Sequence, residues 1–232
     1  KRLGEAAAEL LYPSRCPLCG IISEGICEKC RSALPLVEQP CCMQCGKPLD
    51  TEEEYCLDCS KEKHLYLRGR SALCYEGDAK EAIHKIKYEN KRAYIGPLAE
   101  LMAERLAGDV RRWDPQVLIP VPMTENTRKS RGFNQAEILA RHLGRVWGIP
   151  VDTQLLVKLV DTGEQKKLDK RMRRRNLRNA FEARENGKYT RVLLIDDVYT
   201  TGSTVDAAAG ALHEAGIPEV FYAAVCIGYG SS

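Results

Sequence analysis

The chain has 232 residues and a formal net charge of only +3, so its overall charge does not indicate a nucleic-acid partner. This length allows one large domain or two small ones with a buried core. No apolar run approaches the roughly 20 residues that a membrane-spanning helix needs. The opening residues, up to Leu11, are expected to form a short amphipathic helix. They contain Glu5 and Glu9 and no long apolar run, so we expect no signal peptide and a cytoplasmic protein.

Cysteine is concentrated near the start of the chain, where nine of the eleven cysteines lie between Cys16 and Cys59. Eight of these nine form four CxxC units, and glycine follows two of the units directly, as CPLCG and CMQCG. A tight CxxC turn directs two thiolates at one cation, and two such turns make a tetrahedral Cys₄ zinc site. Large apolar residues are few here, so metal is expected to replace a core. The predicted zinc ligands are Cys16, Cys19, Cys27, Cys30, Cys42, Cys45, Cys56 and Cys59.

The pairing of the CxxC units is open at this point. Sequential pairing, the simplest, puts the first two units in one site and the last two in the other, and an interleaved pairing is the alternative. Cys41 offers a second register beside Cys42, although Cys42 keeps the CxxC spacing. Iron–sulfur ligation is the alternative to structural zinc. A redox role fits poorly, because four copies in a polar segment lack a flanking βαβ pattern.

The residues after the cysteines predict a linker, a strand and two helices. Asp58–Leu67 is polar and lysine-rich and is expected to be the linker. Arg70–Tyr75 is a candidate strand. Ala79–Tyr88 and Tyr94–Leu106 have apolar residues at helical spacing, and Gly108 is expected to stop the second helix.

The middle of the chain predicts the start of an α/β sheet. Val117–Val121 is fit for a buried strand, and the polar residues after it, which include Arg131, are expected to form a flexible loop. Asn134 is expected to cap a helix that Gly148 closes. The predicted apolar side of this helix consists of Ile138, Leu139, Leu143 and Val146. With a further buried strand at Glu219–Ile227, the order of elements predicts a mostly parallel sheet with flanking helices.

The strongest local charge lies in Gln165–Arg178, where basic residues face a single acid, Asp169. At helical spacing they cover most of one helix and are suited to clamp a pyrophosphate group or a nucleic-acid backbone. The alternative is a solvated charged helix, which is the commoner fate of such runs. The predicted nucleic-acid-binding residues are Lys170, Arg171, Arg173, Arg174, Arg175 and Arg178.

The most specific motif is VLLIDDVYTTGST at Val192–Thr204. Its first four residues predict a short buried strand, Asp196 and Asp197 follow, and a hydroxyl- and glycine-rich turn leads to a helix at Val205–Ala215. A helix N-terminus leaves N–H groups unpaired and can bind a phosphate. Carboxylates at the carboxyl end of the strand can accept hydrogen bonds from sugar hydroxyls. The motif therefore predicts a sugar-phosphate site.

This motif resembles the phosphoribosyl-pyrophosphate (PRPP) signature of the type I phosphoribosyltransferases and matches it throughout. The resemblance implies that fold. It also implies that Asp196 and Asp197 bind the ribose 2′- and 3′-hydroxyls and that Thr200–Thr204 binds the 5′-phosphate. The PRPP-binding residues so implied are Asp196, Asp197, Val198, Tyr199, Thr200, Thr201, Gly202, Ser203 and Thr204. The alternative is an ordinary strand–helix turn with surface acids.

A second resemblance covers nearly the whole chain, from Pro13 to Ile227. PVPMTENTRKSRGFNQAEILA is similar to a block of the ComF family of bacterial competence-associated phosphoribosyltransferase-like proteins, and the CPLCG module belongs to the same architecture. The family's downstream spacing is matched by Gln165, Leu168, Arg173, Asn176 and Phe181. The resemblance implies a double zinc ribbon domain at 1–62 and a type I phosphoribosyltransferase-like domain at 63–232.

The resemblance implies PRPP and Mg²⁺ as ligands but does not establish an activity. In a catalysed reaction, pyrophosphate would leave C1 of PRPP while positive charge gathers on the ribose. Asp196 and Asp197 suit that charge, Arg131 is the candidate catalytic clamp on the leaving group, and Lys87 is a candidate pyrophosphate contact. The sequence indicates no acceptor.

Three functions follow as hypotheses. The first is a working phosphoribosyltransferase with an unknown acceptor. The second, implied by the ComF resemblance, is a role in natural transformation, in which the protein binds single-stranded DNA beside a competence helicase at the inner face of the membrane. The third is a regulator that binds PRPP without turnover. The first two are compatible, and we favour a protein that does both.

Overall fold

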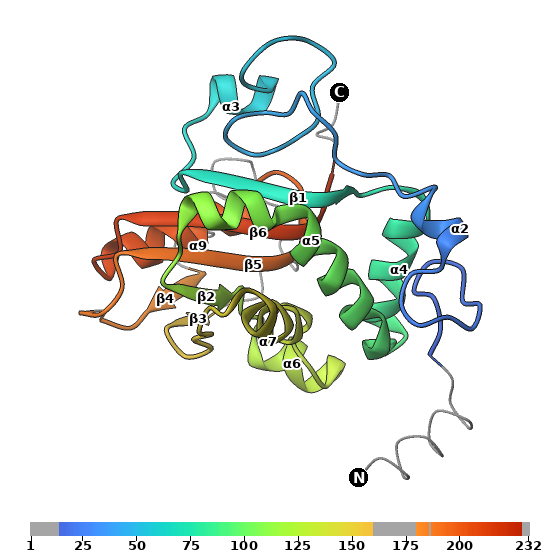
Figure 1. The fold of residues 1–232 in the computed structure, drawn as a ribbon. Helices are drawn as coiled ribbons and strands as arrows, with labels where there is room; N and C mark the ends of the chain where they lie inside the picture. The colour runs from blue at the N-terminus through green and yellow to red at the C-terminus, as the bar shows by residue number, and fades with distance from the viewer. Residues whose placement is uncertain (1–13, 160–179, 186, 229–232) are drawn as a thin grey trace, which may run out of the picture.

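The computed structural model describes residues 14–159, 180–185 and 187–228. Over these residues the chain forms a sheet with helices on both faces (Figure 1). The cysteine-rich segment lies along the sheet edge formed by β1 (Arg68–Cys74), with α3 (Leu57–Lys61) in a lobe above that strand and α2 (Glu28–Arg31) near α4 (Figure 1). None of the described helices is both long and apolar enough to cross a membrane.

The main sheet of the described residues has the strand order β1, β6, β5, β2, and every neighbouring pair is parallel. The three strands beside β1 are β2 (Val117–Pro120), β5 (Arg191–Tyr199) and β6 (Glu219–Ile227). They are rich in branched and aromatic residues that are buried on both faces, as is typical of central parallel strands. Since the strands are parallel, their carboxyl ends meet at one edge of the sheet, which is where such sheets bind ligands.

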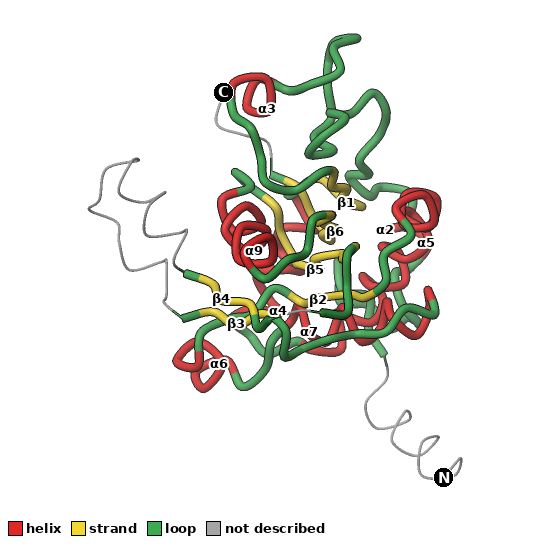
Figure 2. The backbone as a smooth tube through the Cα atoms, turned by 90° about the vertical axis from the view of Figure 1, so that its left-hand side faces the viewer, coloured by secondary structure: helices red, strands yellow, loops and turns green. Residues whose placement is uncertain are grey.

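Two cores lie on the two faces of this sheet. Leu193 and Ile195 of β5 pack in the core formed with α5 and α7, whereas Val192 and Leu194 pack in the core formed with α9. Figure 2 shows α9 on one side of the strands and α5 on the other. The helices that cover the faces are α4 (Gly77–Tyr88), α5 (Ile95–Trp113), α7 (Gln135–Trp147) and α9 (Ser203–Glu214).

The predicted strands and long helices are present, and one predicted helix end is wrong. α5 does not stop at Gly108 but continues to Trp113, because Val110 and Trp113 are buried and repay the modest cost of an internal glycine. The helix ends instead at Asp114, whose φ is +47°. Asn134 caps α7 as predicted, by accepting a hydrogen bond from the Ala136 N–H, although Val146 is 56% exposed and does not belong to the apolar side.

The segment predicted as a flexible polar loop is a helix. α6 (Glu125–Arg131) begins at Thr124, whose hydroxyl accepts a hydrogen bond from the Thr127 N–H, and ends at Gly132, whose φ is +78°. Local caps of this kind can hold a short helix that lacks an apolar face. The expected linker at residues 58–67 is likewise partly helical, because α3 occupies its start.

Several short elements were not predicted, among them α2, β3 (Leu156–Lys158), β4 (Phe181–Ala183) and η1 (Arg92–Tyr94), and some predictions fall outside the described residues. β3 pairs antiparallel with β4 and packs near α9, and η1 precedes α5. The helix predicted at residues 1–11 and the basic segment at residues 165–178 lie outside the described residues.

A glycine in β1 is predicted to be essential for the close approach of β6. A Cβ at Gly69 would lie 1.8 Å from the Tyr222 ring, so Gly69→Ala should lower stability by about 1–3 kcal/mol. Gly108→Ala is the matched control: nothing lies within 4 Å of its Cβ position, and alanine in a helix should be neutral or stabilising by up to about 1 kcal/mol. Midpoints of thermal unfolding test both, and equal midpoints would contradict the packing described here.

Candidate functional site

The predicted phosphate loop lies where β5 ends and α9 begins. β5 ends at Tyr199, and residues 200–202 lead directly into the first turn of α9. Gly202 is the N-cap and has a φ of +80°, a conformation that residues with side chains rarely adopt. A Cβ at Gly202 would also lie 2.5 Å from the Tyr199 hydroxyl. Both the backbone and the surroundings therefore require glycine here.

The loop presents polar groups at a helix N-terminus. Thr200 and Thr201 are exposed, and Ser203 and Thr204 are half-buried in the first turn of α9. The Thr201 and Ser203 hydroxyl oxygens lie 2.9 Å apart. Because the N-cap is a glycine, no side chain of the cap residue competes for the first-turn N–H groups. An α9 of twelve residues thus offers amides and hydroxyls that suit an anion.

The sequence predicted that the two acids of the motif follow the strand. This was wrong, because both acids lie inside β5. The strand continues through them because Asp196 pairs with Ala224 of β6, and the next rungs pair as far as Tyr199. The Asp197 N–H donates to the Asp196 carboxylate at 2.8 Å. Burial raises the pKa of Asp196 well above its ordinary value, and the neighbouring charge of Asp197 raises it further. A positively charged group beside these two carboxylates would therefore be favoured.

Lys87 supplies a positive charge to this acidic pair. Its Nζ lies 2.6 Å from the Asp197 carboxylate, of which only 6% is exposed. Burial works against the lysine charge, but Asp197 and, more weakly, Asp196 outweigh it and raise the pKa of Lys87. Lys87 therefore keeps its positive charge at neutral pH. Lys87 projects from the last turn of α4, so this pair joins that helix to the end of β5.

Lys87 also borders an open cleft of about 490 Å³ between the end of α4 and α6. Arg131 lies in the same cleft, with its guanidinium carbon 5.8 Å from the Tyr88 ring centre and one N–H donated to Gln135 at 2.9 Å. The structure thus brings together the two cations that the sequence had selected from segments far apart in the chain. The cleft is lined by Lys87, Tyr88, Asn90, Asn126, Thr127, Ser130, Arg131 and Phe133.

Several of these cleft residues were not predicted from the sequence. Asn126 and Ser130 were missed because their segment was interpreted as a loop, whereas α6 holds them on one wall. Tyr88 and Asn90 flank the end of α4 and carry no motif of their own; their closeness to Lys87 in sequence was the one available signal. The predicted nucleic-acid-binding residues, from Lys170 to Arg178, lie outside the described residues.

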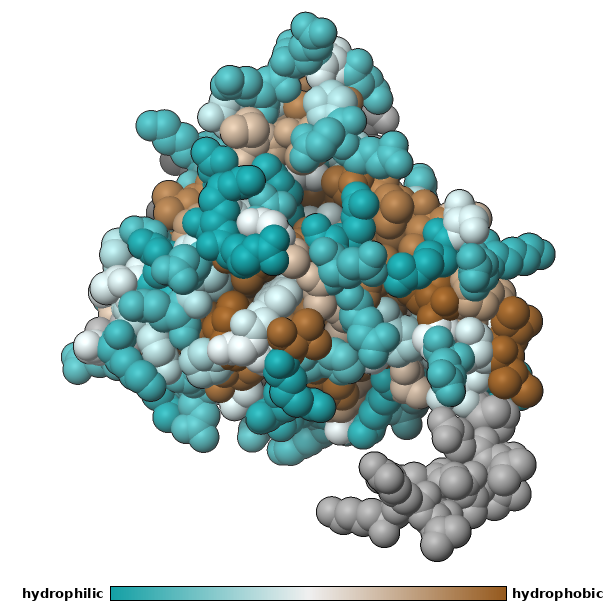
Figure 3. All heavy atoms as spheres, in the orientation of Figure 1, coloured by the Kyte–Doolittle hydropathy of each residue, from teal (hydrophilic) through white to brown (hydrophobic). Residues whose placement is uncertain are grey.

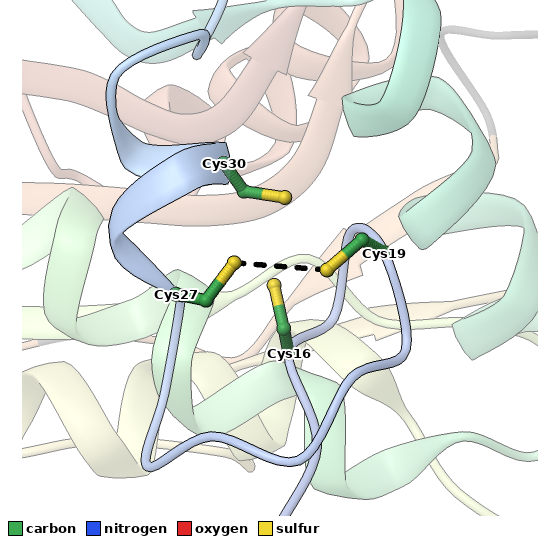
Figure 4. A group of neighbouring side chains, drawn as sticks. All are labelled: Cys16, Cys19, Cys27 and Cys30. Carbon is green, nitrogen blue, oxygen red and sulfur yellow. Dashed lines mark hydrogen bonds between the residues drawn. The ribbon is translucent and has the colours of Figure 1, made fainter.

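The eight predicted metal ligands form two separate clusters. In each cluster the four Sγ atoms lie within 4.8 Å of one another, and the pairing is sequential: Cys16, Cys19, Cys27 and Cys30 in one, and Cys42, Cys45, Cys56 and Cys59 in the other. Figure 4 shows the first four side chains pointing toward a common centre. The Sγ atoms of Cys19 and Cys27 are 3.6 Å apart. Tetrahedral zinc with Zn–S bonds of about 2.3 Å needs S···S distances near 3.8 Å, so this donor set fits zinc.

The CxxC turns have the geometry predicted for them. Gly20 and Gly46, directly after the second cysteine of their units, have φ values of +77° and +72°, and each donates its N–H to the carbonyl of the first cysteine. Burial opposes the Cys16 thiolate, but backbone hydrogen bonds from Cys19 and Cys27 outweigh it and lower the pKa of Cys16 to about 7. Cys41 is buried but belongs to neither cluster, so the alternative register is wrong.

The second cluster lies in a lobe with a largely polar surface. Hydrophilic side chains cover most of the face in Figure 3, including the lobe with α3. Lys47, only 5% exposed, lies 2.5 Å from Asp58, and burial works against its charge while Asp58 and the Cys45 and Cys56 sulfurs raise its pKa. A buried ammonium that interacts with two of the ligand sulfurs offsets part of the negative charge of a Cys₄ zinc site.

Elemental analysis should find about two zinc ions per chain. Cys42→Ser removes one ligand and should lower the content to about one, because the two clusters share no sulfur. Cys41→Ser changes the neighbouring thiol and should leave the content at about two. A single zinc in the native protein, or the loss of one from Cys41→Ser, would contradict the two-site arrangement.

Comparison with known proteins agrees with this geometry. Residues 7–60 match the family described as the double zinc ribbon domain, and residues 97–231 match the phosphoribosyl transferase domain, which is more than half of the chain. The first match contains all eight predicted zinc ligands, and the second contains Arg131, Asp196, Asp197 and the loop at residues 200–204, whereas Lys87 lies before it.

Curated relatives cover most of the chain. It is 29% identical to "Competence protein F" of Haemophilus influenzae over 86% of this chain and 89% of that protein. It is 30% identical to "Competence protein ComFC" of Bacillus subtilis over 83% and 80% of the two chains, and 28% identical to "DNA utilization protein YhgH" of Escherichia coli K12 over 94% and 98%. The chain therefore belongs to the ComF family, with a type I phosphoribosyltransferase fold preceded by a double zinc ribbon.

Proposed function

We propose that the protein binds PRPP together with Mg²⁺ at the end of β5 and acts in DNA uptake during natural transformation, where it binds single-stranded DNA. The observation that carries the first part is the Lys87–Asp197 pair, 2.6 Å long, beside a glycine-capped helix N-terminus. An acid pair, a phosphate loop and a cationic cleft together match the three parts of PRPP, which are its ribose, 5′-phosphate and pyrophosphate.

In this proposal each part of the site has one task. Residues 200–204 bind the 5′-phosphate through first-turn amides and hydroxyls. Asp196 and Asp197 accept hydrogen bonds from the ribose hydroxyls. Lys87 and Arg131 bind the pyrophosphate from the two sides of the cleft. Val198 and Tyr199 continue the strand backbone that holds the loop.

Mg²⁺ would reach this site with its phosphates, and the acids suit it. Burial raises the pKa of Asp196 and the neighbouring charge of Asp197 raises it further, so a nearby cation would favour its ionised form. When bound, Mg²⁺ supplies positive charge to the pyrophosphate oxygens. Asp196 and Asp197 would face the ribose, and Arg131 would hold the group that leaves.

Turnover is a separate question from binding. A phosphoribosyltransferase of nucleotide or nucleobase metabolism and a non-catalytic PRPP sensor are the alternatives, and both use the same site. No acceptor is proposed, because the residues lining the cleft are mostly polar or charged and do not select one base.

The DNA part of the proposal depends on the relatives and on the basic segment. Curated relatives are named competence proteins and DNA utilization proteins. We propose that Lys170, Arg171, Arg173, Arg174, Arg175 and Arg178 contact the phosphate backbone of single-stranded DNA. A competence helicase is the proposed protein partner.

We also propose that the chain is divided into two domains, at residues 1–62 and 63–232.

Calorimetry with PRPP and Mg²⁺ tests the ligand. The native protein should bind, and Asp196→Asn should weaken binding by at least about tenfold, because a charged hydrogen bond contributes roughly 1.5–3 kcal/mol. Burial raises the pKa of Asp196, so its charge lowers stability once pH exceeds the ordinary carboxyl pKa. The neutral asparagine should therefore keep or raise the thermal midpoint at pH 7. Equal affinity in the two proteins would contradict the ribose role.

Pyrophosphate release in the same samples separates the alternatives. Release that depends on PRPP indicates a transferase or a hydrolytic side reaction, whereas binding without release favours the sensor. A native protein that binds no PRPP would contradict the ligand assignment altogether.

Single-stranded DNA binding should be salt-dependent and should weaken when Arg173, Arg174 and Arg175 are changed to Glu. Removing about three phosphate contacts should lower the slope of log affinity against log salt by roughly 2 for a single strand. The matched control changes Arg111, Arg112 and Arg145 to Glu; these residues lie on α5 and α7. Equal losses in the two triple variants would contradict a dedicated DNA-binding segment.

A further inference from the structure

The residues between the second zinc ribbon and β1 are not a free linker, because they lie along α9. The Leu65 carbonyl lies 2.7 Å from Nε2 of His213 in the last turn of α9. A Leu65 methyl carbon comes within 3.2 Å of where a Cβ would stand at Gly210, in the same helix. The segment that follows Cys59 is thus packed on the helix whose N-terminus forms the phosphate loop.

The same segment is bonded to the first turn of α9. Asp206 accepts the Leu65 N–H at 2.8 Å with one carboxylate oxygen, and its other oxygen lies 2.7 Å from Nδ1 of His64. The His64 side chain is only 3% exposed. Its Cε1 atom lies 3.1 Å from where a Cβ would stand at Gly202, the N-cap. His64 therefore packs against the loop glycine and also contacts Asp206 in the first turn of α9.

Tyrosines support the loop from the sheet side and connect it to a metal ligand. The hydroxyls of Tyr66 and Tyr199 lie 2.7 Å apart, in the core. The Tyr199 ring stacks on Tyr222 at 4.6 Å with a 5° angle between the planes. The Tyr222 hydroxyl donates to the Cys45 carbonyl at 2.6 Å. An unbroken series of contacts thus runs from the second ribbon to the loop.

We propose that His64 and Asp206 are positioning residues for phosphate binding, through which the second ribbon holds the loop and the first turn of α9 in binding geometry. This inference rests on the proposed PRPP function. Gly202 has no side chain with which to fix its own conformation, so contacts from outside the loop must do so. The atoms nearest to its Cβ position belong to the side chains of Tyr199 and His64.

The test measures PRPP affinity and amide hydrogen exchange in the full-length chain. Asp206→Ala should weaken PRPP binding by about tenfold and accelerate exchange across residues 200–206, because it removes both bonds to the segment. Asp206→Asn should restore most of the affinity, since an amide can still accept the Leu65 N–H. His64→Phe keeps the ring stacked on Tyr66 but loses the carboxylate bond, so it should show an intermediate loss.

Asp109→Ala is the matched control. Asp109 has a similarly buried carboxylate, 24% exposed against 27% for Asp206, and pairs with Arg70 of β1 at 3.9 Å, away from the loop. It should leave PRPP affinity and exchange at residues 200–206 unchanged. If Asp206→Ala binds PRPP as tightly as the native protein, or if the two variants lose affinity equally, the inference fails while the proposed function stands. A native protein without PRPP affinity would overturn both.

Discussion

The buried ion pair between Lys87 and Asp197 is the contact on which the arrangement of the site depends. It fixes the end of α4 against the carboxyl end of β5, and removing one partner would leave an uncompensated buried charge, at a cost of about 3–5 kcal/mol. The proposed ligand could separate Lys87 from Asp197 without leaving either charge uncompensated. A ribose hydroxyl can donate to Asp197 while the pyrophosphate gives Lys87 a new anionic partner. Each of the two residues would then have a new polar partner in the ligand.

The two zinc ribbons extend the cores of the main sheet. Cysteines of the first ribbon, such as Cys16, pack in the core shared by α5 and α7, and those of the second, such as Cys42, pack in the core under α9. Between the ribbons, the Val37 N–H donates to the Ala72 carbonyl and the Cys74 N–H to the Pro35 carbonyl, so this segment covers the outer edge of β1. Metal thus substitutes for apolar residues in segments too polar to fold alone, and an exposed strand edge is removed at the same time.

Local signals were readable from the sequence, and distant contacts were not. The CxxC spacing and the glycine after two of the units fix the turns, so the eight ligands could be predicted from the sequence. Which units share a site could be decided only from the fold. α6 was missed because its stability lies in its caps at Thr124 and Gly132 and not in an apolar face. β3 and β4 pair across more than twenty intervening residues without a hairpin turn signal. Asp206 and His64 are 142 positions apart in the sequence, and no motif around either residue indicates their contact.

The position of Asp206 would be a puzzle without its partners. A carboxylate in the first turn stabilises a helix through its dipole, but it also repels a phosphate that binds the same N-terminus. The Leu65 N–H donates to one of its oxygens and Nδ1 of His64 lies 2.7 Å from the other, so polar contacts with the 64–65 segment offset part of the carboxylate charge. The helix thereby keeps the benefit of the acid while its amides stay available. A glycine-containing loop that is ordered before the ligand arrives also spares the ligand the entropy of ordering it. In the arrangement that we propose, the segment after the second ribbon serves both the electrostatics and the rigidity of the phosphate loop.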